Sequence, residues 1–106
     1  MSTRLGTSTF YFLLTQTGLP VRYSHFTSPQ SPPYLVYRGN GQTTWGADNG
    51  MYWKENNYIV EFYYKEKDPE AEDAIENILT ESGIYYEKSE DIYIEDEDVF
   101  VIYYYI

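Results

Sequence analysis

The sequence contains no cysteine. Disulfide scaffolds, zinc fingers and thiol catalysis are therefore excluded. No apolar run approaches the ~20 residues that a membrane-spanning helix needs, so we expect no membrane partner. Residues 1–18 contain one early arginine and a short apolar cluster, without a small-residue cleavage site. We therefore expect a soluble protein of a reducing compartment.

Basic residues are scarce: there are 7 Lys and Arg against 17 Asp and Glu, which gives a formal net charge of −10. Residues 1–64 carry three acids and four bases (+1), whereas residues 65–106 carry fourteen acids and three bases (−11). Such a segment repels the phosphate backbone of DNA, which disfavours nucleic-acid binding. Because this segment is also rich in aromatic residues, it is predicted to be folded and to present an acidic face. The candidate residues of that face are Glu87, Glu90, Asp91, Glu95, Asp96, Glu97 and Asp98.

Residue patterns typical of catalysis are lacking as well. His25 is the only histidine, and its neighbour Ser24 is expected to point to the opposite face of a strand, so the two predict no catalytic dyad. The acidic run 95–98 offers no contrast between a buried acid and an ionised one, and the segment from Asp91 lacks the glycine of an EF-hand. The glycines of "RGNGQTTWGADNG" do not have phosphate-loop spacing. We predict a protein that is not an enzyme and has no cofactor or metal.

Hydrophobic periodicity and capping signals predict one domain over residues 1–106, with the order α-β-β-β-β-α-β-β. The expected class is α+β, a mostly antiparallel sheet with two helices packed on one face. Expected helices cover residues 8–17, capped by Thr7 or Ser8, and the segment between Asp68 and Gly83. Expected strands cover residues 21–26, 34–38, 51–54, 58–65, a segment from 85 onward and 99–106, with a loop or flexible hairpin over 39–50, a turn at 55–57, and an acidic loop or short strand from 89.

Alternation in the strand at 58–65 indicates which side chains are buried. Its core face should hold Tyr58, Val60, Phe62 and Tyr64. The second helix has an apolar stripe of Ala71, Ala74, Ile75, Ile78 and Leu79. Phe62, Ile75, Leu79 and Val101 are the predicted core residues.

The stretch "TSPQSPPYLVY", residues 27–37, has two readings. Pro29 to Pro32 matches the PxxP pattern of polyproline ligands, which is short and common. Alternatively, the prolines stiffen a connection between two strands and bring Pro33 to the start of the second one, where no ladder donor is lost. The position between two predicted strands favours the second reading.

Three segments together carry a family resemblance: "TGLPVRYSHFTSPQSPPYLVY", "GADNGMYWKENNYIVEFYYKEKDPEAEDAIENIL" and "IYYEKSED". The shared pattern is a helix ending in T-G-L-P-V, a proline pair before Y-x-V-Y, an A-D-N tripeptide, and N-N-Y before an alternating strand and a K-D-P helix. Over residues 10–106 the chain resembles the small tail-completion and tail-terminator (tail-to-head joining) proteins of long-tailed phages and prophages of Gram-positive bacteria. The C-terminal "VFVIYYYI" is more aromatic than this pattern.

The resemblance implies a structural virion protein without enzymatic activity. Such proteins form a ring, commonly a hexamer, at the head-proximal end of the tail tube, where the ring ends tube polymerisation and joins the tail to the head connector. The implied partners are further copies of the chain, the tail tube protein and a head–tail connector or stopper protein. Double-stranded DNA would pass through the ring without specific binding. The protein would be assembled in the host cytoplasm and found in the virion.

Candidate interface residues come from two aromatic or irregular segments. Residues 38–50 show no periodicity, and Trp45 has no evident core position. The aromatic C-terminal strand is a second candidate contact. The candidate interface residues are Arg38, Trp45, Asp48, Asn49, Tyr103 and Tyr105, and the acidic face is the candidate lumen lining.

Two other classes of protein fit the same sequence. One is a head-completion or stopper protein of the connector. The other is an acidic DNA mimic that inhibits a nucleic-acid-binding enzyme, which would gather its acids on one outer face of a monomer or dimer. A ring protein should instead assemble into a larger particle, so molecular size separates these alternatives.

Overall fold

The chain forms a six-stranded sheet with two helices in the computed structural model, which describes residues 6–46, 50 and 52–106. The helices are α1 (Thr7–Thr15) and α2 (Pro69–Glu81). The strands are β1 (Val21–Tyr23), β2 (Tyr34–Gly46), β3 (Tyr52–Tyr64), β4 (Glu87–Lys88), β5 (Ile92–Ile94) and β6 (Val99–Tyr105). The strand order is β1-β2-β3-β6-β4, and β5 also pairs with β6. Only β1–β2 among these pairs is parallel, so the predicted α+β class with a mostly antiparallel sheet is confirmed.

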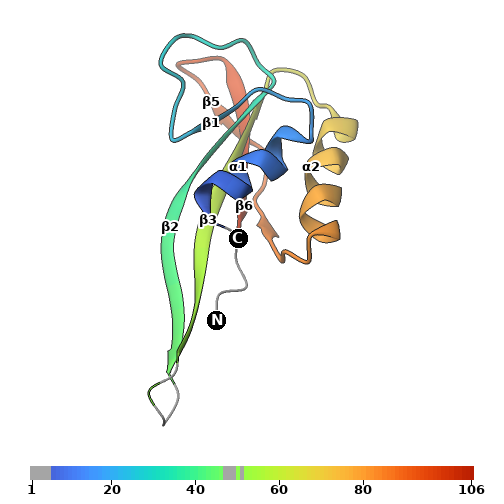
Figure 1. Cartoon of the computed structure of the whole chain (residues 1–106). Coiled ribbons are helices and arrows are strands. Elements are labelled where there is room, and N and C mark those ends of the chain that lie inside the picture. The colour runs from blue at the N-terminus through green and yellow to red at the C-terminus, as the bar shows by residue number, and fades with distance from the viewer. Residues whose placement is uncertain (1–5, 47–49, 51) are drawn as a thin grey trace.

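Both helices lie on the same face of the sheet (Figure 1). The predicted alternation of β3 is confirmed, because Tyr58, Val60, Phe62 and Tyr64 all belong to the core between sheet and helices. Helix residues that complete this core are Phe10, Leu14, Ile75 and Leu79. Val101 is also fully buried, as predicted. Neither of the two described helices covers the opposite face of the sheet, and it is the face from which the candidate site is built.

Helix α2 follows from local signals. The Asp68 side chain accepts a hydrogen bond from the backbone N–H of Ala71 and caps the first turn. At the other end Gly83 takes a left-handed conformation, with φ of +73°. The N–H of Ile84 then donates to the carbonyl of Leu79 at 2.9 Å and closes the helix. The predicted boundaries of this helix are confirmed.

Of the two structures expected for residues 39–50, the loop is wrong for residues 39–46, whereas the hairpin agrees with the antiparallel pairing of β2 and β3. The turn expected at 55–57 is wrong. β2 continues to Gly46, and β3 runs from Tyr52 without interruption, so the two form one long antiparallel ribbon. The ladder has a bulge between Gly39 and Gln42. Backbone pairing holds this ribbon together, and polar residues on its faces give no alternating pattern from which a strand could be predicted.

Three smaller boundaries also differ from the prediction. The residue before α1 is Gly6, which forms no side-chain cap, so capping by Thr7 or Ser8 is wrong. β1 ends at Tyr23 because Ser24 adopts a left-handed φ of +67°, which breaks the pleat. The strand expected from Tyr85 onward is reduced to Glu87–Lys88.

Candidate protein interface

The distal parts of β2 and β3 form an arm, which we define as residues 39–46 with 52–57. The arm projects from the body of the molecule, away from both helices (Figure 1), and the principal extents of the chain are 52 × 26 × 24 Å. Every residue of β2 from Gly39 to Gly46 is exposed. A two-stranded ribbon alone is marginally stable in water, so an arm of this kind is suited to a contact with another protein.

The side chains of the arm that the structure describes are polar apart from one large aromatic. The Gln42 amide donates to Asn56 at 2.7 Å, and the Asn57 amide donates to the Thr43 hydroxyl at 2.9 Å. Trp45, a predicted interface residue, is 48% exposed and contributes nothing to the core. An exposed tryptophan on a projecting ribbon is a typical anchor for a protein contact. The predicted interface residues Asp48 and Asn49 lie outside the described residues.

Arg38, another predicted interface residue, lies at the base of the arm and is held by a buried carboxylate. Its Nε lies 2.8 Å from Oε2 of Glu61, which is only 8% exposed. The Tyr63 hydroxyl donates to Oε1 of the same carboxylate at 2.6 Å. Burial, and then the hydrogen bond to Glu61, raise the pKa of Tyr63. Glu61 therefore orients Arg38 and Tyr63, a link that sequence patterns did not reveal because the partners lie on different strands.

Four tyrosines on the same face of the sheet surround this ion pair. The Tyr34 and Tyr63 rings are stacked with centroids 5.0 Å apart, and those of Tyr103 and Tyr105 are 6.1 Å apart. Tyr103 lies directly opposite Glu61 in the ladder, so the two predicted residues Tyr103 and Tyr105 lie close to Arg38. We call this set the tyrosine face: Tyr34, Arg38, Tyr63, Tyr103 and Tyr105. Tyr and Arg are the residues enriched in protein interfaces.

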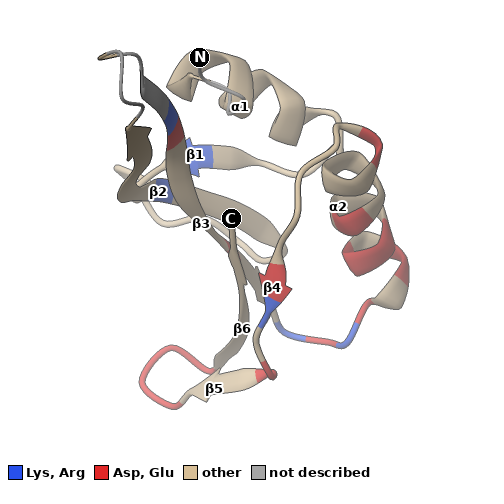
Figure 2. Ribbon diagram, turned by 90° about the horizontal axis from the view of Figure 1, so that it is seen from below, with Lys and Arg blue, Asp and Glu red and all other residues tan. Residues whose placement is uncertain are grey.

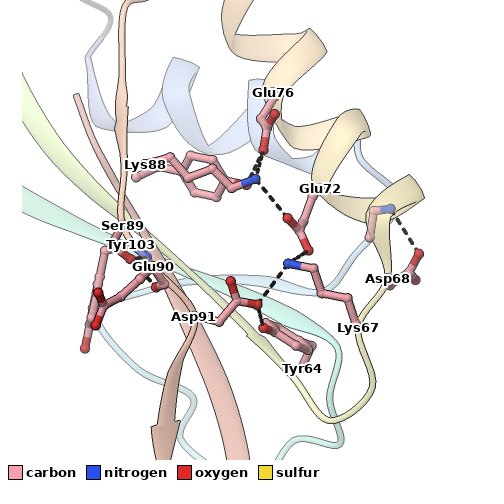
Figure 3. Close-up of polar contacts among 12 residues, drawn as sticks. Tyr64, Lys67, Asp68, Glu72, Glu76, Lys88, Ser89, Glu90, Asp91 and Tyr103 are labelled. Carbon is pink, nitrogen blue, oxygen red and sulfur yellow. Dashed lines mark hydrogen bonds and ion pairs between the residues drawn. The ribbon is translucent and has the colours of Figure 1, made fainter.

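An ion-pair network joins α2 to the chain between β4 and β5 (Figure 3). The Glu72 carboxylate, buried with a side chain 5% exposed, lies 2.8 Å from Lys67 Nζ and 2.9 Å from Lys88 Nζ. Lys67 also contacts Asp91 at 2.8 Å, and Lys88 contacts Glu76 at 2.7 Å. Sequence analysis did not predict this network. A signal for it was present, because residues 65–106 contain only three lysines among fourteen acids, so each lysine was bound to have carboxylates near it.

Two tyrosines extend the network into the sheet. The Tyr64 hydroxyl donates to Asp91, and the Tyr104 hydroxyl donates to Glu76 at 2.8 Å. Hydrogen bonds from Lys67 and Tyr64 lower the pKa of Asp91, while burial raises the pKa of Tyr64 to about 12. The network therefore links Lys88 and Asp91 to α2 and, through Tyr64 and Tyr104, to the core.

The acids of the predicted face lie in β4, in the segment that follows it, and in the turn between β5 and β6. Figure 2 shows these stretches in red, together with further acids on α2. Asp91 is paired with Lys67, and Asp98 accepts from Tyr93 at 2.8 Å and lies 3.7 Å from Lys65. The remaining candidates, which are exposed, are Glu87, Glu90, Glu95, Asp96 and Glu97. The β5–β6 turn and the arm lie at opposite ends of the sheet (Figure 1).

An open hollow of about 500 Å³ lies beside the tyrosine face, under the segment that connects β1 and β2. We call it the aromatic hollow; its lining includes Ser24, His25, Phe26, Tyr34, Tyr63 and Glu97. Pro29 also lines it, and β2 begins directly after Pro33, as expected for a stiff connection between strands.

The expected separation of Ser24 and His25 is wrong. The left-handed backbone at Ser24 brings its Oγ within 3.2 Å of His25 Nδ1. Both residues are exposed, and in the described part of the chain no carboxylate forms a hydrogen bond with His25. The two side chains are therefore in contact but lack the third, orienting group of a catalytic triad.

The described ranges contain neither a cluster of metal-ligating side chains nor a helix suited to spanning a membrane. Within residues 6–46, 50 and 52–106, no group of three or more metal-ligating side chains is close enough to hold an ion. Neither of the two helices described is long and apolar enough to cross a membrane. Comparisons with protein-family models, with curated proteins and with solved structures found no match for this chain.

Proposed function

We propose that the chain is a tail-terminator protein that forms a ring at the head-proximal end of a phage tail tube. In this role the ring ends tube polymerisation and joins the tail to the head connector. The observation that carries the proposal is the arm: an exposed ribbon, projecting from a compact body, that adds nothing to the core. Together with the sequence resemblance, it favours a subunit that is completed by contacts with other protein chains.

The two ends of the domain differ, which suits a protein that stops a growing polymer. A tube grows by a repeated head-to-tail contact that does not close on itself. A terminator has to bind the end of the tube with one surface, and its opposite surface must not bind a further tube subunit. We assign the arm and Arg38 to contacts with neighbouring copies or the tube, and the exposed acids of the β5–β6 turn to the lumen or the non-polymerising side.

Ring closure needs a contact between two different surfaces of the same chain. The path of paired strands ends at β1 on one side and at β4 and β5 on the other. Both edges are short strands, and the tyrosine face lies between them. The β1 edge and the β4/β5 edge, with the tyrosine face between them, supply the two unlike halves of a heterologous contact between copies.

The charge of the chain suits a channel for DNA. With a net charge of −10, the ring would not hold a passing phosphate backbone. The DNA-mimic alternative needs free acids together on one outer face, whereas Asp91 and Asp98 lie within ion-pair distance of Lys67 and Lys65. A stopper of the connector is the alternative that shares most features with the terminator.

The role of the arm is tested in a phage that lacks the gene. We expect the wild-type chain, supplied in trans, to restore infectious particles, and a chain lacking residues 42–57 to fail although it is folded. A matched control is Glu81→Gln, which changes one exposed acid at the end of α2, outside the proposed contacts, and should restore the phage. Full restoration by the armless chain would contradict the proposal.

A further inference from the structure

The aromatic hollow shares Tyr34 and Tyr63 with the tyrosine face, but the connection between β1 and β2 that forms its wall has no part in the contacts proposed above. Its floor is the sheet face that carries Tyr34, Val36 and Tyr63, and its wall is the connection that follows β1. The volume of about 500 Å³ lies within the range of ligand sites in proteins. Because the hollow is open to solvent, a group can enter it from outside.

The walls of the hollow are aromatic rings in fixed mutual positions. Phe26 packs edge-on against Tyr34, with centroids 5.1 Å apart and ring planes at 75°. Tyr34 in turn stacks on Tyr63 at 5.0 Å. Three linked rings around an open space attract a cation, because the faces of aromatic rings carry negative charge.

Glu97 adds a full negative charge at the rim. It lines the hollow, and no ion pair to its side chain is present in the described ranges. Its neighbour Asp98 differs, since it contacts Lys65 and Tyr93. The charge of Glu97 also reaches Tyr34, whose pKa is raised by burial and then by this carboxylate.

A guanidinium group already contacts one of these rings from outside the hollow. Arg22 lies over Phe26, with its Cζ 5.7 Å from the ring centroid, and donates to the carbonyl of Val21. Arg22 is not part of the lining. Among the described residues, the lining therefore holds aromatic rings and Glu97 but no lysine or arginine. A planar guanidinium fits a stacked site better than an ammonium does.

We propose that the aromatic hollow is a binding site for an arginine side chain presented by a protein partner. The chain itself does not supply this cation from its described residues, because its other cations are engaged or distant. The cations paired with carboxylates are Arg38, Lys65, Lys67 and Lys88. Lys54 lies on the arm, at the opposite end of the sheet (Figure 1).

This inference does not depend on the terminator role, since it is tested on the isolated chain. The probe is Nα-acetyl-arginine methylamide, and the matched neutral probe is the citrulline analogue, which has the same shape without the charge. Binding is followed by NMR chemical shifts. We expect the arginine probe to shift resonances of Phe26, Tyr34 and Tyr63 and to bind at least about fivefold more tightly than the citrulline probe.

Variants then separate this site from general attraction to an acidic protein. Glu97→Gln should weaken arginine binding about two- to fivefold, as expected for an exposed charge pair, whereas Glu87→Gln should leave it unchanged. Tyr34→Phe should keep binding within about twofold, and Tyr34→Leu should lose it. Equal binding of both probes, no shift at the three rings, or unchanged binding in Glu97→Gln would overturn the proposal.

Discussion

Removal of the arm is the perturbation that separates its role in folding from its role in assembly. Gly39 and Tyr58 are opposite each other in the β2–β3 ladder. Deletion of residues 42–57 therefore leaves Asn40-Gly41 as a two-residue connection between that pair. Asn-Gly is the preferred sequence of a type I′ hairpin turn, and Gly41 already has φ of +80°. The shortened chain should close without strain.

The expected cost of this deletion follows from what the arm contributes. None of the residues of β2 beyond Tyr37 belongs to the hydrophobic core, and Tyr58, which stacks on Phe10 at 4.4 Å, is retained. The hydrogen bonds lost are each worth about 0.5–1.5 kcal/mol. That loss is offset by the conformational entropy of the deleted residues, about 1–2 kcal/mol each. We expect the free energy of unfolding to change by less than about 1 kcal/mol.

Urea unfolding followed by far-ultraviolet circular dichroism measures this change. Tryptophan fluorescence is unsuitable, because both tryptophans of the sequence, Trp45 and Trp53, lie within the deleted residues 42–57. The backbone signal is present in both chains. A cooperative transition close to that of the full chain is predicted. A loss above about 2 kcal/mol, or a broad transition, would show that the arm is part of the folding unit and refute the reasoning.

Three further predictions concern the core and the ion-pair network. Leu79→Ala should lower the free energy of unfolding by about 2–5 kcal/mol in urea, because the side chain is fully buried; a loss below about 1 kcal/mol would contradict its place in the core. Burial and the hydrogen bond to Glu76 raise the pKa of Tyr104 above its ordinary value of 10. The contribution of the protonated hydroxyl to the free energy of unfolding is therefore present below pH 10 and is lost as the pH rises further. Stability curves of Tyr104→Phe should be flatter than wild type above pH 10, and parallel curves would speak against this. Lys67 lowers the pKa of Asp91 below 3.8. The contribution of the ionised carboxylate to the free energy of unfolding is therefore present above this pH and disappears as the pH falls below it. Asp91→Asn should remove this acid-dependent loss of stability, which is measured by unfolding between pH 5 and pH 2.

Signals that are local in the sequence predicted structure well. Asp68 and Gly83 delimit α2 because a cap and a left-handed glycine act within one turn. A hairpin was one of two expectations for residues 39–50, but the length of the arm was not predicted, because its strands are held by backbone pairing and have polar side chains on exposed faces. Of the candidate interface residues, Arg38 and Trp45 could be selected from the lack of periodicity around them. The buried partner Glu61 could not, because its burial arises only when β2, β3 and β6 come together.

Pairing over long sequence separations accounts for the remaining differences. The burial of Glu72 depends on its ion pairs with Lys67, which precedes α2 in the sequence, and with Lys88, which follows it. The aromatic hollow depends on the backbone of Ser24, whose φ of +67° has no sequence signature in a non-glycine residue. These features are properties of the folded chain and became visible only in three dimensions.

Electron microscopy of particles from a phage that lacks this gene tests the central claim most directly. If the chain is a tail terminator, heads and tails should be found unjoined, with tails that are abnormally long or lack a finished upper end. Tails of normal length beside empty or leaking heads would favour the stopper role instead. Full-length tails firmly attached to heads would contradict the proposed function.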